Sequence, residues 1–160
     1  MRLRRIAVLV ACALAPINLF GCGDVDVVTA SYANLQEARE AGAISRGWMP
    51  EGLPPGAHDI REAHGVDTNR RWALFSFPPA ERPVLERLLE RGETSLMGEV
   101  CDVPGRLEWW PVLLRGTLDD EQIRSAGLRA YRAADGNLLF AVNWKQGRAY
   151  YWTPPSGDRP

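Results

Sequence analysis

The chain has 160 residues, of which 19 are basic and 20 are acidic, and its formal net charge at pH 7 is −1. This balance excludes the basic surface of a nucleic-acid-binding domain and the polybasic patch that holds some proteins on anionic membranes. The length is sufficient for one domain besides a targeting segment.

Residues 1–21 have the pattern of a secretory signal peptide. A basic start, Met1 to Arg5, is followed by a run from Ile6 to Phe20 that is apolar apart from Pro16 and Asn18. A membrane-spanning helix needs roughly 20 apolar residues, and this run is shorter and contains a proline. We therefore expect residues 1–21 to be removed rather than to remain as a transmembrane anchor.

The run ends in Leu19-Phe20-Gly21-Cys22, which resembles the lipobox of bacterial lipoproteins. The resemblance implies cleavage before Cys22 and attachment of acyl chains such as palmitate to this residue, which would hold the protein durably on a membrane. Gly23, not Asp, follows the cysteine. By resemblance to the sorting rule of two-membrane bacteria, this implies the outer membrane, facing the periplasm. The alternative is an ordinary secretory signal with an incidental cysteine.

Cleavage before Cys22 would leave 139 residues with 16 basic and 20 acidic residues, a net charge of −4. We expect a lipidated tether over 22–30, a single domain over 31–154 and a disordered tail over 155–160. Since Cys12 would be removed and Cys22 lipidated, Cys101 would have no cysteine to pair with. We expect Cys101 to be a buried small apolar residue, although a reactive nucleophile is the alternative.

Hydrophobic spacing and turn residues predict five elements in the first part of the chain. Ser31 is a suitable helix cap, Gly42 and Gly92 are suitable helix ends, and Pro54-Pro55 is tolerated in a first helical turn. In chain order we expect a helix over 31–41, a strand over 43–50, a helix over 54–64, a strand over 71–77 and a helix over 80–91.

The second part of the chain is richer in strands. Asp119-Asp120 can start a short helix, and turns at Asp135-Gly136 and Gln146-Gly147 separate three apolar runs. We expect a strand over 96–103, a helix over 119–126, and strands over 128–133, 138–144 and 148–153. The fold class is therefore predicted as α+β, with N-terminal helices packed on a mainly antiparallel sheet that ends in a three-stranded meander.

One segment resembles a known family. It comprises Gly47-Trp48-Met49-Pro50, Leu53-Pro54-Pro55, Asp59-Ile60, His64, Asp67-Thr68-Asn69, Trp72 and Phe75-x-Phe77. This order of residues is similar to the YbbD head-like proteins of bacteria, many of which are lipoproteins or membrane-attached. The resemblance implies a fold and a compartment, but no chemistry.

The same segment contains a candidate polar pocket formed by His64, Asp67, Asn69 and Trp72. The alternative is structural, because Asp and Asn at a turn bond to nearby backbone groups without any ligand. Metal donors also gather here, namely His58, Asp59, Glu62, His64 and Asp67. On the predicted helix the two histidines would point about 240° apart, so we expect no metal site.

The aromatic runs Trp109-Trp110-Pro111 and Tyr150-Tyr151-Trp152 suggest a binding surface. Neighbouring residues on a strand point to opposite faces, so part of each run could face solvent. We take Trp109, Trp110 and Tyr151 as candidates, with Arg106, Arg115 and Arg148 nearby, because Trp, Tyr and Arg are common at binding hot spots. The alternative is a sheet covered on both faces.

No nucleophile motif, phosphate-binding loop or cofactor motif is present in the sequence. We therefore expect a non-enzymatic envelope lipoprotein that binds a macromolecule, most simply an envelope protein. Two alternatives remain open. One is a cell-wall hydrolase using acidic residues among Glu93, Glu99, Glu108 and Asp119-Asp120. The other is a periplasmic immunity or inhibitor protein.

Overall fold

The computed structural model describes residues 26–155. The predicted signal peptide, Cys22 and residues 156–160 of the predicted tail lie outside this range. Within it, no helix has both the length and the apolar character needed to cross a membrane.

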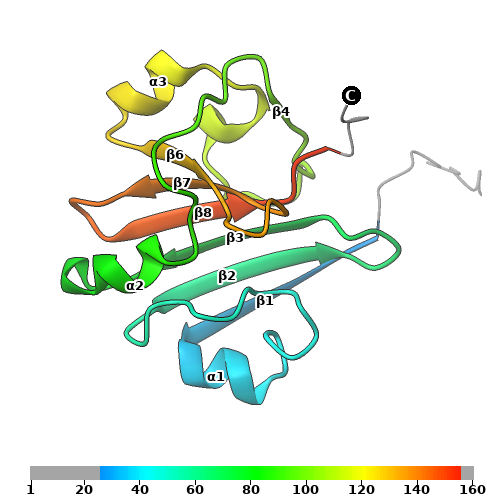
Figure 1. Ribbon diagram of the computed structural model, residues 1–160. Coiled ribbons are helices and arrows are strands. Elements are labelled where there is room, and N and C mark those ends of the chain that lie inside the picture. The colour runs from blue at the N-terminus through cyan, green and yellow to red at the C-terminus, as the bar shows by residue number, and fades with distance from the viewer. Residues whose placement is uncertain (1–25, 156–160) are drawn as a thin grey trace, which may run out of the picture.

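A six-stranded antiparallel sheet forms the centre of the fold, with the strand order β1-β2-β3-β8-β7-β6 (Figure 1). A second, two-stranded sheet joins β4 to β5. The strands are β1 (Val27–Asn34), β2 (His58–Gly65), β3 (Arg71–Ser76), β4 (Val100–Cys101), β5 (Gly116–Thr117), β6 (Arg129–Arg132), β7 (Leu139–Asn143) and β8 (Arg148–Trp152). The helices are α1 (Leu35–Glu40), α2 (Arg82–Glu86) and α3 (Asp120–Ser125), with short 3-10 turns at Pro79–Glu81 and Val112–Leu114.

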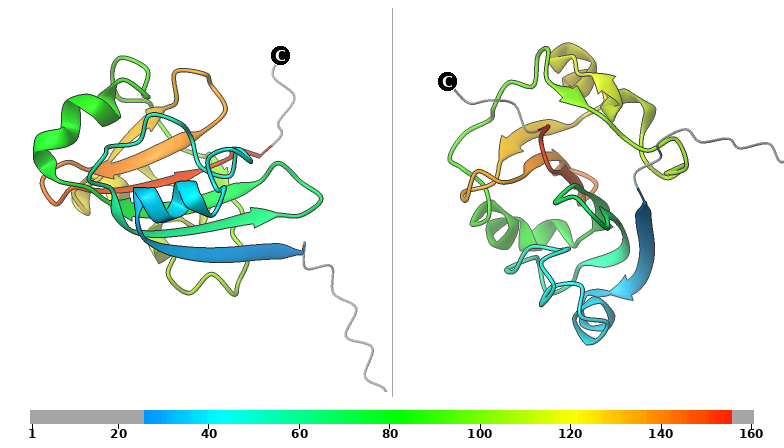
Figure 2. Two further views of the ribbon diagram at one scale, coloured as in Figure 1. Left: turned by 90° about the horizontal axis from the view of Figure 1, so that it is seen from below. Right: turned by 90° about the vertical axis from the view of Figure 1, so that its right-hand side faces the viewer.

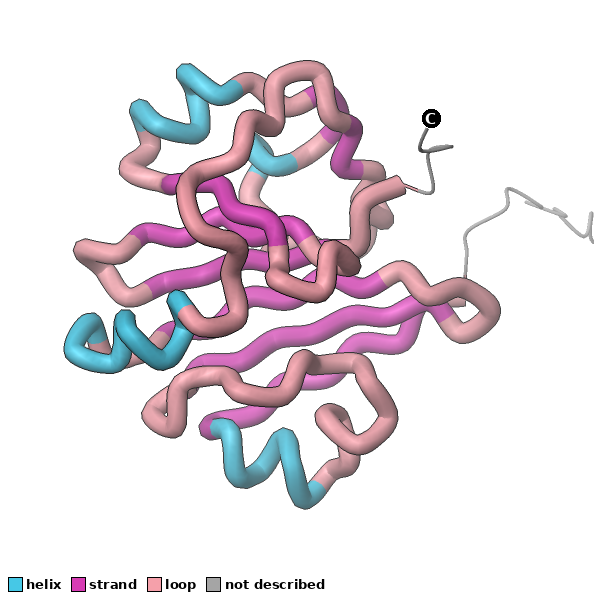
Figure 3. The backbone as a smooth tube through the Cα atoms, viewed as in Figure 1, coloured by secondary structure: helices cyan, strands magenta, loops and turns pink. Residues whose placement is uncertain are grey.

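Both faces of the large sheet carry a hydrophobic core. Alternation along each strand sends Ile60 and Phe75 to one face, and Ala63 and Trp72 to the other. The first face, which we call the α1 face, packs against α1, residues 43–57 and α2. The second, which we call the α3 face, packs against residues 96–128, including α3. Figure 3 shows helices and loops on both sides of the strands, and the right-hand view of Figure 2 shows how strongly the sheet twists.

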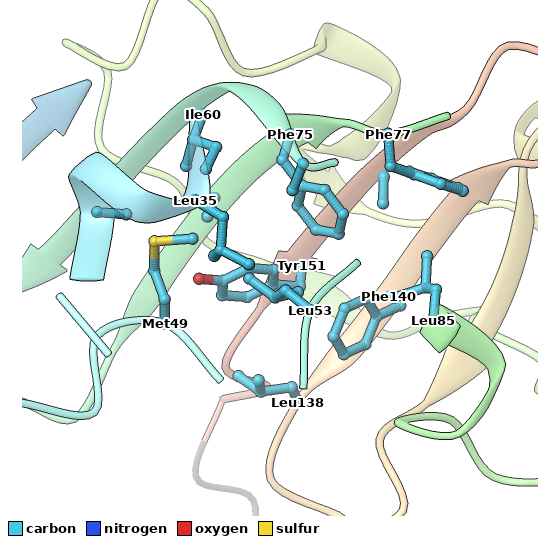
Figure 4. Packing of buried hydrophobic residues seen from close by; sticks show 14 of the residues in the cluster. Leu35, Met49, Leu53, Ile60, Phe75, Phe77, Leu85, Leu138, Phe140 and Tyr151 are labelled. Atoms are coloured by element: carbon cyan, nitrogen blue, oxygen red, sulfur yellow. The ribbon is translucent and has the colours of Figure 1, made fainter. Parts of the chain in front are cut away.

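The core of the α1 face is dense (Figure 4). Leu35 from α1, Leu53 from the following loop and Leu85 from α2 converge on Phe140 and Tyr151 of the sheet. Each of these five side chains is at most 2% exposed. Burial of apolar side chains therefore fixes α1, the loop and α2 against the sheet, although both helices are too short to be stable alone.

The predicted fold class is confirmed: the protein is α+β, and its sheet ends in the meander β6-β7-β8. The predicted strand at 71–77 and the predicted helix at 119–126 are also confirmed. Asp119 caps α3, where its side chain accepts hydrogen bonds from the backbone N–H groups of Glu121 and Gln122. These elements were predictable because caps and hairpin turns depend on neighbouring residues.

The predicted helix over 54–64 is wrong, since His58–Gly65 is the strand β2. β2 pairs with β1 on one side and with β3 on the other. Its run of buried residues fits a strand covered on both faces, and these long-range pairings override the helical preference of its Ala and Glu residues. Asp59 adopts a positive φ of 48°, where the pairing with β3 shifts register.

The predicted helix over 31–41 is correct only from residue 35 onwards. Residues 27–34 form β1, so the strand begins inside the range expected for the tether, 22–30. Asn34, rather than Ser31, caps α1 by accepting a hydrogen bond from the backbone N–H of Glu37 at 3.0 Å. Gly42 follows the helix with a φ of 79°, as its position predicts.

Three further boundaries differ from the prediction. Residues 43–50 form turns instead of a strand, and their backbone bonds to the end of α1. The helix predicted over 80–91 is reduced to a 3-10 turn and α2, because residues 88–94 run along β6 instead. The strand predicted over 96–103 is limited to Val100–Cys101. Tertiary packing thus replaces the first predicted element by turns and shortens the other two.

Cys101 is buried, as predicted, with 1% of its surface exposed on the α3 face. Burial raises the pKa of its thiol to about 12, so the thiolate that a nucleophile requires is not populated near neutral pH. Cys101 is therefore a core residue.

Candidate functional site

An open groove crosses the part of the α3 face nearest β1. It has a volume of about 770 Å³, and its lining includes Thr29, Ser31, Arg61, Leu74, Trp109 and Arg148. Five of these residues come from the strands β1, β2, β3 and β8, which lie side by side in the sheet. Trp109 comes from the loop after β4. The groove exists because residues 96–128 cover only the other part of this sheet face.

The strand register explains how the groove is built. Ser31 lies opposite Arg61, Arg61 lies opposite Leu74, and Leu74 lies opposite Tyr150, so these four residues form one row across the sheet. Leu74 is buried and belongs to neither core cluster. It gives the groove an apolar floor between polar and charged neighbours.

Two arginines make the groove positively charged. Arg61 is exposed on β2, and Arg148 donates a hydrogen bond from Nη2 to the hydroxyl of Ser76 at 2.9 Å. Asp59 is the acidic residue of the lining. The half-buried ring of Trp109 lies beside this charge, and its centroid is 5.9 Å from that of Trp110. The groove therefore combines cationic, aromatic and apolar contacts.

The predicted aromatic surface is only partly correct. Trp109 lines the groove, but Trp110 is 2% exposed and Tyr151 is fully buried. They belong to different cores, Trp110 on the α3 face and Tyr151 on the α1 face. Neither can contribute to an exposed surface, because the sheet is covered on both faces around them. Of the nearby arginines, Arg148 reaches the groove, whereas Arg115 is held by the carbonyl oxygen of Leu107.

Of the four residues of the predicted polar pocket, His64 and Asn69 line one open pocket, which also includes Trp48, whereas Asp67 and Trp72 do not line it. His64 lies on the α1 face and Trp72 on the α3 face, while Asp67 and Asn69 are exposed in the turn between β2 and β3. This turn is held by the backbone of Asn69, whose carbonyl oxygen accepts a hydrogen bond from the hydroxyl of Thr153. The structural interpretation therefore describes Asp67 and Trp72, whereas Asn69 both holds the turn and lies at one pocket with His64.

His64 instead forms a buried pair with Glu62 on the α1 face. His64 Nδ1 lies 3.0 Å from Glu62 Oε2, and the two side chains are 9% and 1% exposed. The imidazole stacks on Trp48, with ring centroids 3.9 Å apart and planes 14° apart. Arg46 lies over the same indole, 4.9 Å from its centroid. The pairing was not predicted, because on the expected helix Glu62 and His64 would point in different directions; as strand residues two apart they share a face.

Within this pair, the carboxyl group of Glu62 is the more strongly affected by burial. Its Oε1 atom is buried and has no hydrogen-bond partner within residues 26–155. Burial raises the pKa of Glu62 above its ordinary value, and the hydrogen bond with His64 offsets part of the increase. Beneath the pair, the Tyr151 hydroxyl donates to the Trp48 carbonyl oxygen at 3.2 Å. The pair is thus enclosed by the loop that packs on β2.

The raised pKa leads to a prediction for stability. When a carboxyl group binds its proton more tightly in the folded state than in the unfolded state, the protein becomes less stable as pH rises. For Glu62 this loss extends from the unfolded-state pKa, 4.5, through the higher pKa of the folded state. Glu62→Gln removes this titration. Urea unfolding at a series of pH values should therefore show the variant gaining stability relative to the wild type as pH rises above 4.5. A difference that is independent of pH would contradict the prediction.

The remaining candidates are the side chains considered as metal ligands or as catalytic carboxylates. No three His, Cys, Asp or Glu side chains within residues 26–155 are grouped to hold a metal ion. Glu93 forms an ion pair with Arg129 at 3.3 Å. Asp120 accepts hydrogen bonds from Ser95 and from the backbone of Leu96, which lower its pKa. Arg124 lies between the two carboxylates, 4.0 Å from Glu93 Oε2 and 3.8 Å from Asp120 Oδ2, so both are held in ion pairs or hydrogen bonds.

Together, the sheet and the groove define the protein as an α+β domain with one partly uncovered sheet face. Residues 26–76 match a family model described as the YbbD head domain. The match covers β1, α1, β2 and β3, and it includes the Glu62–His64 pair and the β1 and β2 side of the groove. Neither the curated proteins nor the solved structures yielded a match to the chain.

Proposed function

We propose that this protein is a lipid-anchored lipoprotein of the bacterial cell envelope, and that its domain is a non-enzymatic module that binds another envelope protein through the groove. The observation that carries the proposal is the groove itself, in which Trp109 and two arginines lie on an otherwise covered sheet face. Trp and Arg are the residue types that most often dominate binding energy at protein interfaces.

The position of the groove is consistent with an anchor at Cys22. Val27, the first residue of β1, is five residues after Cys22, and an extended chain of that length spans at most roughly 18 Å. The groove begins at Thr29 on the same strand. A domain anchored in this way would keep its groove close to the membrane surface, where a partner in the envelope could reach it.

The lipid anchor can be tested by metabolic labelling. In cells that produce the full-length chain and are fed an alkyne fatty acid, we expect the wild type to be labelled and to remain with the membranes. Cys22→Ala should be neither labelled nor processed, because the thiol that forms the thioether is missing. Cys101→Ala is the control, and it should be labelled like the wild type. An unlabelled wild type would show that the cysteine is incidental.

The binding function can be tested by affinity capture of the full-length protein from detergent-solubilised envelopes, followed by mass spectrometry. We expect a stoichiometric protein partner that is lost with Trp109→Ala and with Arg61→Glu. Val112→Ala is the matched control, because Val112 is a large apolar residue that is 84% exposed and lies outside the groove. Circular dichroism would verify that each variant remains folded.

Capture has two informative negative results. A partner retained by both groove variants would place the interface elsewhere on the domain. No partner for the wild type would contradict the proposal and favour glycan binding or hydrolysis instead.

A further inference from the structure

We propose, on the basis of the function above, that the partner contributes an extended acidic segment that pairs with β1 as a seventh strand of the sheet. Strand addition needs a sheet edge with unpaired backbone groups, and side-chain contacts beside the edge then select the partner.

The edge at β6 is closed by the chain itself. The backbone N–H of Glu90 donates to the carbonyl oxygen of Arg132 at 2.8 Å, and that of Thr94 donates to Ala130 at 2.9 Å. Residues 88–94 thus occupy the outer side of β6. No segment within residues 26–155 runs along the outer side of β1 in this way. The open edge is therefore β1.

The register shows which groups of β1 point outward. Val66 donates its backbone N–H to the carbonyl oxygen of Asp26, so the backbone N–H and C=O groups of residue 26 point towards β2. Because these groups alternate in direction along an antiparallel strand, those of residues 28, 30 and 32 also point towards β2. The backbone N–H and C=O groups of the odd-numbered residues of β1 therefore point away from the sheet. Two side chains confirm this, since Arg106 donates to the carbonyl oxygen of Val27 and Glu37 accepts from the N–H of Ala33, both at 2.6 Å.

Arg106 and Glu37 close the two ends of the edge and leave its middle open. The outward N–H and C=O groups of Thr29 and Ser31 have no partner within residues 26–155. Side chains that cap an edge limit uncontrolled pairing with other chains. Here the caps restrict pairing to a short window, and this window is directly beside the groove.

The side chains around the window indicate the chemistry of the partner. On the groove side β1 presents only small residues, Thr29, Ser31 and Ala33, so side chains of an added strand can reach Arg61 in the row behind them. Arg106 adds positive charge at one end, and the Glu37 carboxylate lies at the other. On the other face β1 presents Val28, which is 46% exposed. We infer a segment in which acidic and apolar residues alternate.

A second copy of the protein is the less suitable occupant. Antiparallel pairing of two β1 edges would bring Arg106 of each copy to the Glu37 end of the other. It would also place the Arg61 side chains of both copies on one face of the joined sheet, where β1 presents only Thr29, Ser31 and Ala33 and therefore offers no carboxylate. An acidic segment neutralises the same charges.

The test is selection of random linear peptides displayed on phage against the full-length lipidated protein in detergent micelles. We expect the selected peptides to alternate acidic and apolar residues. Thr29→Pro removes one outward N–H without affecting the pairing with β2, and proline is tolerated at such edge positions. It should weaken binding of a synthetic selected peptide by about tenfold. Thr29→Val keeps the N–H and the shape, and it should bind like the wild type.

Three results would overturn strand addition: no selected peptide, selected peptides without acidic residues, or binding that is unaffected by Thr29→Pro. If the wild type is a dimer that dissociates with Thr29→Pro, the occupant of the β1 edge is a second copy of the protein, and the acidic segment is likewise ruled out. None of these results contradicts the proposed function, which fails only if capture from envelopes yields no partner that depends on the groove.

Discussion

Substitution of Gly147 by alanine is expected to lower the free energy of unfolding by about 3 kcal/mol, because it combines a strained backbone with a steric clash. Gly147 lies in the turn between β7 and β8 with a φ of 63°. Its carbonyl oxygen accepts a hydrogen bond from the N–H of Phe77 at 2.7 Å, and a Cβ atom at Gly147 would overlap the carbonyl oxygen of Phe77. The hairpin and the end of β3 would have to separate.

Gly116 is the matched control for this substitution. Its φ of 66° is nearly the same, and apart from Gly116 and its two chain neighbours no residue within 26–155 has an atom within 4 Å of the position of its Cβ. Gly116→Ala should therefore show the backbone strain alone, about 1 to 2 kcal/mol. Urea unfolding followed by circular dichroism measures both variants. Equal losses would mean that the contact with Phe77 contributes nothing.

Trp110→Ala is the second large effect, with an expected loss of about 3 to 5 kcal/mol. The ring centroid of Trp110 lies 5.9 Å from those of Trp109, Tyr150 and Trp152, in edge-to-face contacts. Its indole N–H also donates to the carbonyl oxygen of Leu114 at 2.8 Å. Alanine would leave both a cavity at the centre of the α3 face and an unpaired carbonyl group.

Trp109→Ala is the control, and it should cost less than half as much, because the Trp109 ring is only half-buried. Thermal unfolding followed by circular dichroism compares the two variants. The difference matters for binding studies, since a variant that lacks both tryptophans would lose the partner by unfolding. If Trp110→Ala proved as mild as Trp109→Ala, the core of the α3 face would be less tightly packed than the structure indicates.

The residues that line the groove come from both inside and outside the segment that matches the family model. Thr29, Ser31 and Arg61 lie within the matched residues 26–76, whereas Trp109 and Arg148 lie outside them. The β1 edge thus belongs to the part that is similar to the YbbD head domain. The aromatic and cationic wall opposite it comes from the remainder of this chain, so the two parts would contribute separately to the selection of a partner.

The correct and the wrong predictions differ in the range of the interactions that decide them. The strands β7 and β8 and the helix α3 follow from adjacent turns and a capping aspartate, all within a few residues. β2 was mistaken for a helix because its sequence contains residues that favour helices, and only pairing with β1 and β3 makes it a strand. The same error concealed the Glu62–His64 pair, which exists only with strand geometry.

The sequence by itself determined the α+β class, the C-terminal meander, the core position of Cys101 and the resemblance to the YbbD head domain. These properties depend on composition, local periodicity and short turns. Only the tertiary structure decided which aromatic residues are buried and where the open groove lies. The reason is that the strand order places β8 beside β3 and leaves β1 at the edge, and such contacts between distant segments leave no periodic signal in the chain.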